Sequence, residues 1–247
     1  MSEYRERKYR KNIRSRDLVS FQVAVKETDL WISADRDLAD EARDLILGCR
    51  HKLETYIRSH PEFLTTLKPY PEDPYSPPII GDMIQASDVA GVGPMACVAG
   101  AVASYVGQGL LKGWTKQVIV ENGGDIFLRA NRTVTVSLFA GKSVLSEKIG
   151  IKVPVEKMPL GICSSSGTVG HSLSMGRSDM ICLISSSALI ADAGATALGN
   201  RIRTRDDLGK AAGWAGDIEG ISGGVVILDD QMSVWGDIEL ISLNGEM

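Results

Sequence analysis

The stretch from residue 61 to residue 82 constrains the fold most, because proline interrupts it at six positions. Proline lacks a backbone N–H and holds φ at about −65°, so neither a continuous helix nor a central strand can run through the segment. The prolines are Pro61, Pro69, Pro71, Pro74, Pro77 and Pro78. We therefore expect a long Pro-rich loop at 61–82. Such loops often act as lids or binding edges, and a plain connector between lobes fits the sequence equally well.

Before this loop, the sequence predicts two strands and a helix. The apolar run 18–25 reads as a buried strand, and residues 29–32 read as a second short strand. Residues 33–35 are suited to cap the helix that follows. Apolar residues then recur every three or four positions, which is the period of a helix packed by one face. These residues are Leu38, Ala42, Leu45, Ile46, Cys49, Leu53 and Ile57.

The first 16 residues are locally basic, with seven Lys and Arg residues between Arg5 and Arg16. One interpretation is an arm that contacts nucleic acid or phosphate. The interpretation that we favour is a solvated edge strand, in which Lys and Arg block edge-to-edge pairing.

After the loop, glycine and small residues alternate with apolar runs. Residues 91–103 predict a glycine turn that opens a small-residue helix, with Pro94 in its first turn. Residues 118–120 and 180–184 predict buried strands, Ser185–Ser187 can cap a helix over about 188–201, and residues 224–235 predict a hairpin. Residues 161–167 predict a small-residue loop. The expected fold class is therefore α/β (α+β), with mixed or antiparallel sheets and helices in two lobes of one domain, 1–247.

Composition is that of an ordinary globular chain, with 44% hydrophobic and 23% charged residues. The formal net charge of −4 does not favour nucleic acid or an anionic membrane as a partner. The four cysteines form no C-x-x-C pair, which indicates buried thiols in a reducing compartment. No signal peptide and no continuous apolar run of about 18 residues is evident, so we expect a cytoplasmic protein. The sequence leaves open whether the chain forms a homo-oligomer.

Three segments carry candidate chemistry. The first is Gly123-Gly124-Asp125 at a strand end, where glycines let the backbone approach a ligand or simply form a tight turn. The second is Ser164–Gly167, whose hydroxyls and N–H groups could bind phosphate oxygens or could be ordinary loop. His171 follows this segment and is a candidate base, although no nucleophile elbow is present.

The third segment is a helix that carries Asp192 and, four residues later, Thr196. Residues at this spacing share one helix face. An acidic residue among small apolar neighbours needs a compensating partner. Mg²⁺ is one such partner, because it binds one or two carboxylates with substrate phosphates completing its shell. An arginine or a neighbouring backbone that the carboxylate caps would serve as well.

Together, the ordered motifs between about 91 and 200 resemble the ApbE superfamily, which includes FAD:protein FMN transferases. The resemblance implies Mg²⁺ ligands at Asp192 and Thr196. It also implies that Gly123, Gly124, Asp125, Ser165, Ser166 and Gly167 lie against a flavin nucleotide such as FAD. The motif set Glu27–Leu30, Gly93–Ala96 and Glu121–Asp125 is closer still to a smaller ApbE-like branch, which has been associated with sulfur assimilation in anaerobes.

Two departures from the transferase pattern limit what carries over. Transferases have a lysine where this chain has Ala99, before Gly100, and an Asp-Pro pair where this chain has Ser-Leu after His171. Loss of a cation beside a diphosphate affects phosphoryl transfer more than ligand binding, because transfer depends on charge stabilisation. The sequence thus leaves three functions open: a flavin- or nucleotide-binding protein, a Mg²⁺-dependent flavin transferase with Asp192 or His171 as catalytic candidates, and a non-catalytic interaction protein in sulfur assimilation.

Overall fold

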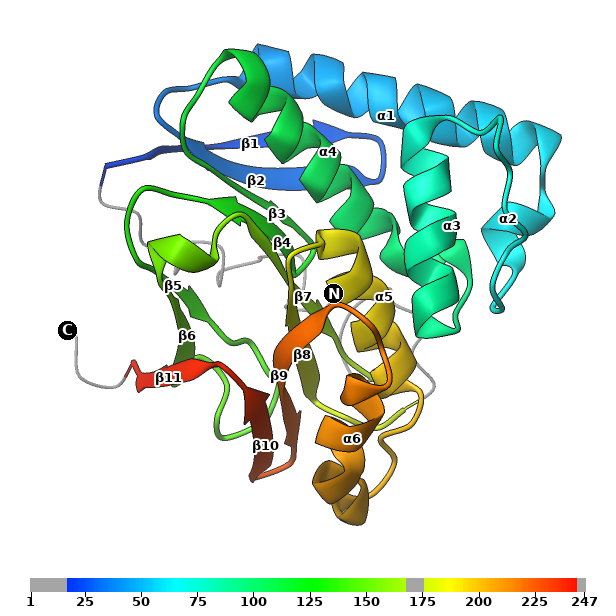
Figure 1. Ribbon diagram of the computed structural model, residues 1–247. Coiled ribbons are helices and arrows are strands. Elements are labelled where there is room, and N and C mark those ends of the chain that lie inside the picture. The colour runs from blue at the N-terminus through cyan, green and yellow to red at the C-terminus, as the bar shows by residue number, and fades with distance from the viewer. Residues whose placement is uncertain (1–16, 168–175, 244–247) are drawn as a thin grey trace.

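The computed structural model describes residues 17–167 and 176–243, and these residues form three layers (Figure 1). An eight-stranded sheet has the order β1-β2-β3-β4-β7-β8-β9-β10, and every neighbouring pair in it is antiparallel. Its strands are β1 (Val19–Val25), β2 (Thr28–Ala34), β3 (Val118–Asn122), β4 (Asp125–Arg129), β7 (Leu160–Ser165), β8 (Met180–Ser185), β9 (Ile221–Leu228) and β10 (Gln231–Gly236).

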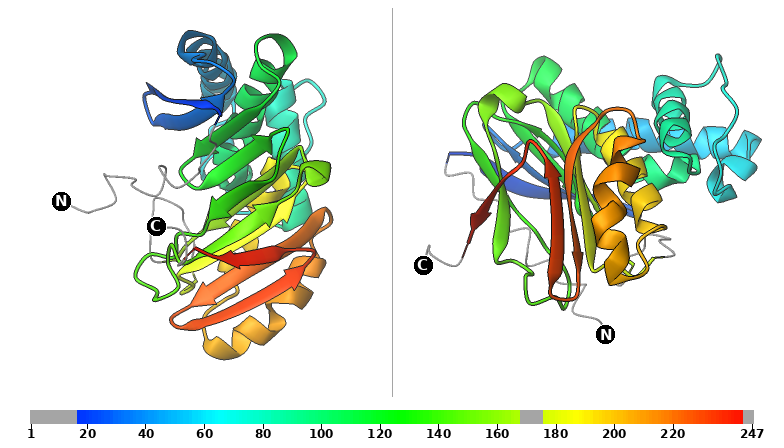
Figure 2. Two further views of the ribbon diagram at one scale, coloured as in Figure 1. Left: turned by 90° about the vertical axis from the view of Figure 1, so that its left-hand side faces the viewer. Right: turned by 60° about the horizontal axis from the view of Figure 1, so that its bottom comes forward.

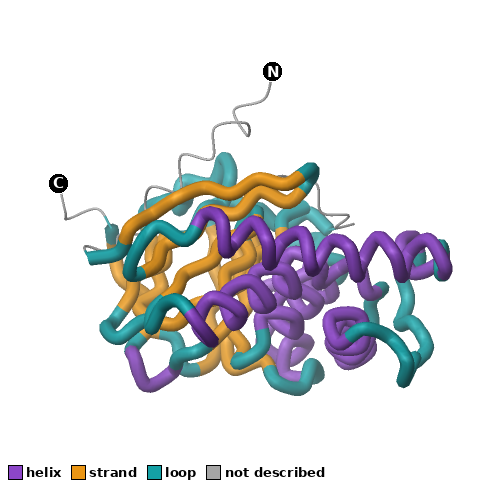
Figure 3. The backbone as a smooth tube through the Cα atoms, turned by 90° about the horizontal axis from the view of Figure 1, so that it is seen from above, coloured by secondary structure: helices purple, strands orange, loops and turns teal. Residues whose placement is uncertain are grey.

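Helices cover one face of this sheet, as Figures 1 and 3 show. They are α1 (Ala39–Ser59), α2 (Glu62–Thr65), α3 (Pro78–Ala90), α4 (Val98–Gly113), α5 (Ala188–Gly199) and α6 (Ala211–Gly216). Helix α4 packs on β3 and β4, and α5 packs on β7 and β8. The largest apolar core lies between this helical layer and the sheet.

A second sheet covers the opposite face (Figure 2). It has the antiparallel order β11-β6-β5, with β5 (Val134–Ser137), β6 (Ile149–Val153) and β11 (Glu239–Ser242). A second apolar core fills the space between the two sheets. The sequence-based prediction of helices with mixed or antiparallel sheets is confirmed, and the second sheet forms the third layer.

The Pro-rich segment is less irregular than the prolines suggest. The four-residue helix α2 lies within it, and α3 begins at Pro78, so the extended stretch ends at residue 77 rather than 82. Proline suits this position because the first N–H of a helix has no intrahelical acceptor. Figure 2 shows α2 and this stretch at the edge of the molecule, beyond the sheet.

The start of α1 also differs from the expectation that residues 33–35 cap it. The helix begins at Ala39, whose N–H bonds to the Asp37 carboxylate at 2.9 Å. Asp35 instead accepts hydrogen bonds from Thr115, Lys116 and Gln117, before β3. The buried stripe of α1 is otherwise as expected, with Ala42, Ile46, Cys49 and Leu53 facing the core.

One segment, Pro94–Gly113, has the length and apolar composition of a membrane-spanning helix. It comprises the 3₁₀ turn η3 (Pro94–Cys97) and α4. Its apolar side chains Val102, Val106 and Leu110 are buried against the sheet, so its hydropathy is that of a core helix. The basic segment 1–16 lies outside the described residues, and its interpretation stays a prediction.

Candidate functional site

Helices α4 and α5 cross where Gly100 meets Asp192. A Cβ atom on Gly100 would lie 2.4 Å from the Ala188 carbonyl oxygen and 3.0 Å from the Asp192 Cβ. Real contacts are not this short, so only glycine permits the crossing. The small-residue character of both helices is therefore a packing requirement, and it brings the polar group of α5 to the first turn of α4.

Asp192 caps the N-terminus of α4 from outside that helix. The residue in the N-cap position, Cys97, makes no side-chain cap hydrogen bond. The Gly100 N–H instead donates to the Asp192 Oδ2 at 2.8 Å. An α-helix leaves its first N–H groups without intrahelical acceptors and carries a partial positive charge there. The partner of Asp192 is thus backbone, one of the alternatives that the sequence left open, and no arginine among the described residues forms an ion pair with it.

The β3–β4 hairpin adjoins this helix end. Gly123 and Gly124 form its two-residue turn with φ of 71° and 112°, a conformation that glycine adopts without strain. The side chain of Asn122, just before the turn, donates to the Ala99 carbonyl at 3.1 Å. The Gly124 N–H donates to Glu121 Oε1 at 2.8 Å. The glycines therefore form a tight turn, and that turn is fixed against the start of α4.

The serine segment lies next to the same hairpin. Ser164 and Ser165 are the last residues of β7, so the expected loop at 161–167 is mostly strand. The Ser164 N–H donates to Asp125 Oδ1 at 3.2 Å. Ser165 is buried, whereas Gly167 is exposed and donates its N–H to the Ser178 carbonyl at 3.0 Å. His171 lies outside the described residues, so its role as a base stays a prediction.

Two buried carboxylates give this cluster its electrostatic character. Burial raises the pKa of Asp192 to about 7, against the opposing effect of the Gly100 and Ala99 N–H groups. Burial and the nearby charge of Asp192 raise the pKa of Asp125 well above its usual range, against the Ser164 N–H. Within residues 17–167 and 176–243, neither carboxylate forms an ion pair with a Lys, Arg or His. Ionising both carboxylates therefore costs free energy, unless a bound cation compensates the two negative charges.

Two thiols border these carboxylates. Cys97 and Cys163 are fully buried and donate to the Pro94 and Ala188 carbonyl oxygens, each at 3.2 Å. Burial and the two aspartates raise the pKa of both thiols well above its usual range. The expectation of free, buried thiols is confirmed for all four cysteines of the chain, and their low reactivity stays a prediction.

The donor set fits a cation that a substrate helps to hold. No group of three His, Cys, Asp or Glu side chains among the described residues could by itself cage a metal. Asp125 and Asp192 offer hard oxygen ligands, and Thr196 follows one turn after Asp192 on a half-buried position. Mg²⁺ is commonly bound by one or two carboxylates with phosphate oxygens and water in the remaining positions. The residues present are compatible with that arrangement.

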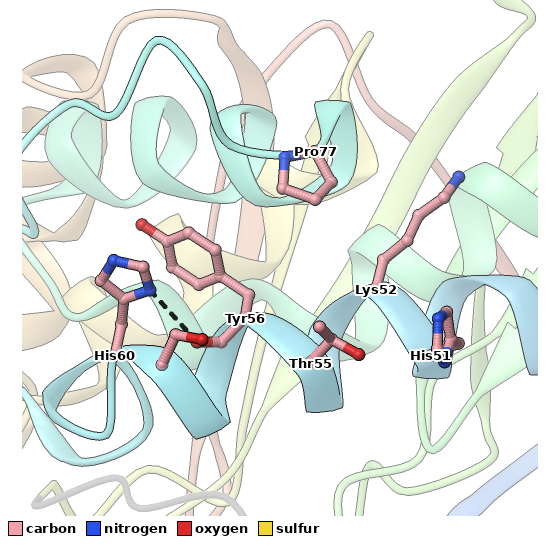
Figure 4. Close-up of a pocket in the computed structure, with 7 residues that line it drawn as sticks. His51, Lys52, Thr55, Tyr56, His60 and Pro77 are labelled. Carbon is pink, nitrogen blue, oxygen red and sulfur yellow. Dashed lines mark hydrogen bonds between the residues drawn. The ribbon is translucent and has the colours of Figure 1, made fainter.

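Two cavities of about 320 Å³ each lie elsewhere on the described chain. One is an open groove along α1, drawn in Figure 4, where the His60 ring stacks on Tyr56 at 4.2 Å. The Tyr56 hydroxyl donates to Asp73, and His60 Nδ1 lies 3.2 Å from the Tyr56 carbonyl oxygen. Neither cavity is lined by Asp125 or Asp192.

Sequence reasoning missed two residues that shape the cluster. Asn122 and Gly100 join the hairpin, α4 and α5, and neither stood out as a functional residue. The available signals were an amide side chain directly before Gly123-Gly124 and a glycine inside an apolar helix, which usually marks a close packing contact.

Comparison with known proteins places the chain in a family. A family model described as AbpE bacteria matches residues 10–212. A UPF0280 protein of Methanococcus aeolicus is 38% identical over 226 residues, covering 90% of this chain and 91% of that protein. A UPF0280 protein of Methanococcus maripaludis is 43% identical over 182 residues, covering 72% of this chain and 74% of that protein.

Solved structures of flavin transferases share the fold at low sequence identity. The apo flavinyl transferase ApbE of Pseudomonas stutzeri superposes with a TM-score of 0.55 at 12% identity, over 91% of this chain and 94% of that protein. A variant of the Vibrio cholerae flavin transferase ApbE superposes with a TM-score of 0.56 at 13% identity, over 88% of this chain and 96% of that protein. The chain therefore belongs to the ApbE-like family whose model is described as AbpE bacteria, and it has the ApbE fold.

Proposed function

We propose that this protein binds a flavin nucleotide, FAD in the first instance, at the cluster where α4, α5 and the β3–β4 hairpin meet. The observation that carries the proposal is the pair of buried carboxylates, Asp125 and Asp192, which lies at a helix N-terminus with no basic partner among the described residues. Such a pair is suited to a divalent cation and, through it, to a phosphate ligand. Membership of the ApbE-like family supports a flavin as the ligand.

Each segment has an assigned role in this proposal. Asp192 and Thr196 hold Mg²⁺. Gly123, Gly124 and Asp125 line the ligand on the hairpin side, and Ser165, Ser166 and Gly167 line it on the β7 side. Bound Mg²⁺ would supply positive charge that offsets the phosphate charge and the two aspartates. The turn glycines leave the hairpin without bulky side chains, so that a ligand can approach its backbone closely.

Binding without transfer is favoured over a transferase reaction, because Ala99 leaves the start of α4 without a cationic side chain. Ala99 contributes backbone groups alone: its carbonyl accepts from Asn122, and its N–H faces Asp192. Phosphoryl transfer depends on charge stabilisation at the reacting phosphate. A flavin transferase reaction, named for the solved structures of the same fold, is therefore the second candidate, and the interaction protein in sulfur assimilation is the third.

One experiment separates the first two candidates. Equilibrium dialysis of the full chain against FAD, FMN and ADP, each with MgCl₂ or EDTA, should show saturable binding that requires Mg²⁺. Asp217→Asn, which changes an exposed acid outside the cluster, serves as the matched control and should bind normally. Release of AMP from FAD would establish transfer or hydrolysis in place of simple binding. Absence of binding to all three nucleotides in both conditions would refute the proposal and favour the interaction protein.

A further inference from the structure

A second cavity lies where the two sheets meet at one end, and it has the features of a separate ligand site. Its volume is about 320 Å³, which is within the range of small-molecule pockets. Ile151 and Val153 of β6, Leu160 of β7 and Ile184 of β8 form its apolar walls. These four side chains belong to the core between the sheets. The cavity is thus a notch in that core, open to solvent at one side.

A β-bulge forms one lip of the notch. The β8–β9 register shifts between Ile184 and Ser185, so that Ser222 is the extra residue on β9. Its hydroxyl donates to the Ile184 carbonyl at 3.0 Å, and the fully buried Ser185 hydroxyl accepts from the Ser187 N–H at 3.1 Å. Gly220, with φ of 90°, turns the chain into this lip. Bulges of this kind redirect side chains beside binding sites.

Two lysines stand at the opening. The Lys157 ammonium lies 2.6 Å from the Asp237 carboxylate and donates to the Asp237 carbonyl at 2.7 Å. Lys152 pairs with Glu239 at 2.8 Å, and Glu239 does not line the notch. The charged side chains that do line it are Lys152, Lys157 and Asp237, which carry one net positive charge.

The two side chains of the Lys157–Asp237 ion pair differ in their exposure to solvent. The side chain of Asp237 is 89% exposed, whereas that of Lys157 is 35% exposed. An ion pair with a partner so open to water contributes little stability. A ligand anion that is attached to an apolar body can displace Asp237 from Lys157, because burial of the body adds a hydrophobic contribution that Asp237 lacks.

We propose that this notch binds a small amphipathic monoanion, whose compact apolar body lies against the core side chains and whose acid group takes the place of the Asp237 carboxylate on Lys157. The site is independent of the proposed flavin cluster, since Asp125 and Asp192 do not line it.

The test uses one ring system in three charge states: 1-naphthoate, neutral 1-naphthamide and 1-naphthylmethylammonium, titrated into the full chain by calorimetry. Naphthoate should bind saturably. The amide and the ammonium should bind at least about tenfold more weakly, as expected for loss of a charge-assisted hydrogen bond. Equal affinity for the acid and the amide, or no saturable binding of naphthoate, would overturn the proposal.

Four variants locate the binding site. Lys157→Gln should weaken naphthoate binding about tenfold, and Asp237→Asn should strengthen it, because the internal competitor for Lys157 is removed. Ser186→Phe, a change at an exposed lip position, should fill the notch and abolish binding. Lys112→Gln, at the exposed end of α4, is the matched control and should leave the affinity unchanged. If Lys157→Gln and Asp237→Asn shift the affinity in the same direction, the ion exchange that the proposal requires does not occur.

Discussion

The Asp192 carboxylate, on α5, accepts a hydrogen bond from the Gly100 N–H of α4 across 2.8 Å, and so caps a helix to which it does not belong. The same carboxylate is the predicted Mg²⁺ ligand. Capping favours the ionised form, whereas burial disfavours it and raises the pKa of Asp192 to about 7. Because of this opposition, the structural and ligand-binding roles of Asp192 can be separated experimentally.

Replacing Asp192 by Asn should weaken Mg²⁺-dependent nucleotide binding and leave the fold largely intact. The amide keeps an acceptor oxygen for the α4 N–H groups but has no charge with which to hold a hard cation. We expect the Kd for FAD in MgCl₂ to rise roughly tenfold or more, corresponding to about 1.4 kcal/mol. In EDTA, neither the wild type nor the variant should show saturable binding. A large drop in melting temperature at pH 8 with the Mg²⁺ dependence intact would show that Asp192 is structural alone.

The unfolding free energy should depend on pH through Asp192. Its folded-state pKa of about 7 lies above the ordinary value of 3.8. Its stabilising contribution is therefore fully present below about pH 4 and is lost as the pH rises toward 7. Relative to the wild type, Asp192→Asn should become more stable between pH 5 and pH 8. Urea unfolding of both proteins across that range measures the difference, and parallel curves would mean that the carboxylate is not held in its protonated form.

Gly100→Ala should destabilise the protein, by about 1–3 kcal/mol for overpacking. The added methyl group would lie 2.4 Å from the Ala188 carbonyl and would push α4 away from α5. Gly113→Ala is the control in the same helix, because nothing lies within 4 Å of a Cβ atom at that position. Thermal unfolding of the two variants should differ clearly, and an equal effect would show that the crossing relaxes without cost.

The turn glycines can be tested by side chains that differ in their tolerance of positive φ. Gly123 has φ of 71° and no atom within 4 Å of an added Cβ, so conformation rather than space limits substitution. Gly123→Asn should be nearly neutral, whereas Gly123→Val should cost about 1–2 kcal/mol or more. Chemical denaturation measures both. If Gly123→Asn folds normally but loses FAD binding, then close approach of the ligand is the reason for glycine at this position.

The four cysteines should resist alkylation in the native state. All are buried, and burial raises the pKa of Cys49, Cys97, Cys163 and Cys182 above the usual range. Titration with a thiol reagent should modify none of them in the native protein and all four after unfolding in guanidinium. Rapid modification of Cys97 or Cys163 in the native protein would instead favour direct thiol chemistry beside the cluster.

Local signals explain what the sequence predicted well. Ser187 caps α5 through a hydrogen bond to the Ile190 N–H, a contact within three residues, and it was expected from the serine run. The Gly123-Gly124 turn, the buried strands β3 and β8 and the terminal hairpin were likewise visible as short patterns. Each depends on residues close together in the chain, where propensity and spacing carry the information.

Long-range contacts explain what the sequence did not predict. Residues 33–35 were expected to cap α1, but Asp35 bonds to Thr115 and Lys116, about 80 residues away. The short strand β11 carries little pattern of its own and is defined by pairing with β6. From the sequence, a backbone partner for Asp192 was one of several alternatives, and the crossing of α4 and α5 was needed to identify it.

The Gly100–Asp192 contact also has a consequence for folding, because it joins residues 92 positions apart. Contacts at this separation form only after a long loop has closed, which slows folding relative to local contacts. During synthesis, helix α4 leaves the ribosome long before α5, so its first turn lacks its capping carboxylate until most of the sheet is available. The candidate site is therefore assembled at a late stage, and its formation reports that α4 on β3 and β4 has met α5 on β7 and β8.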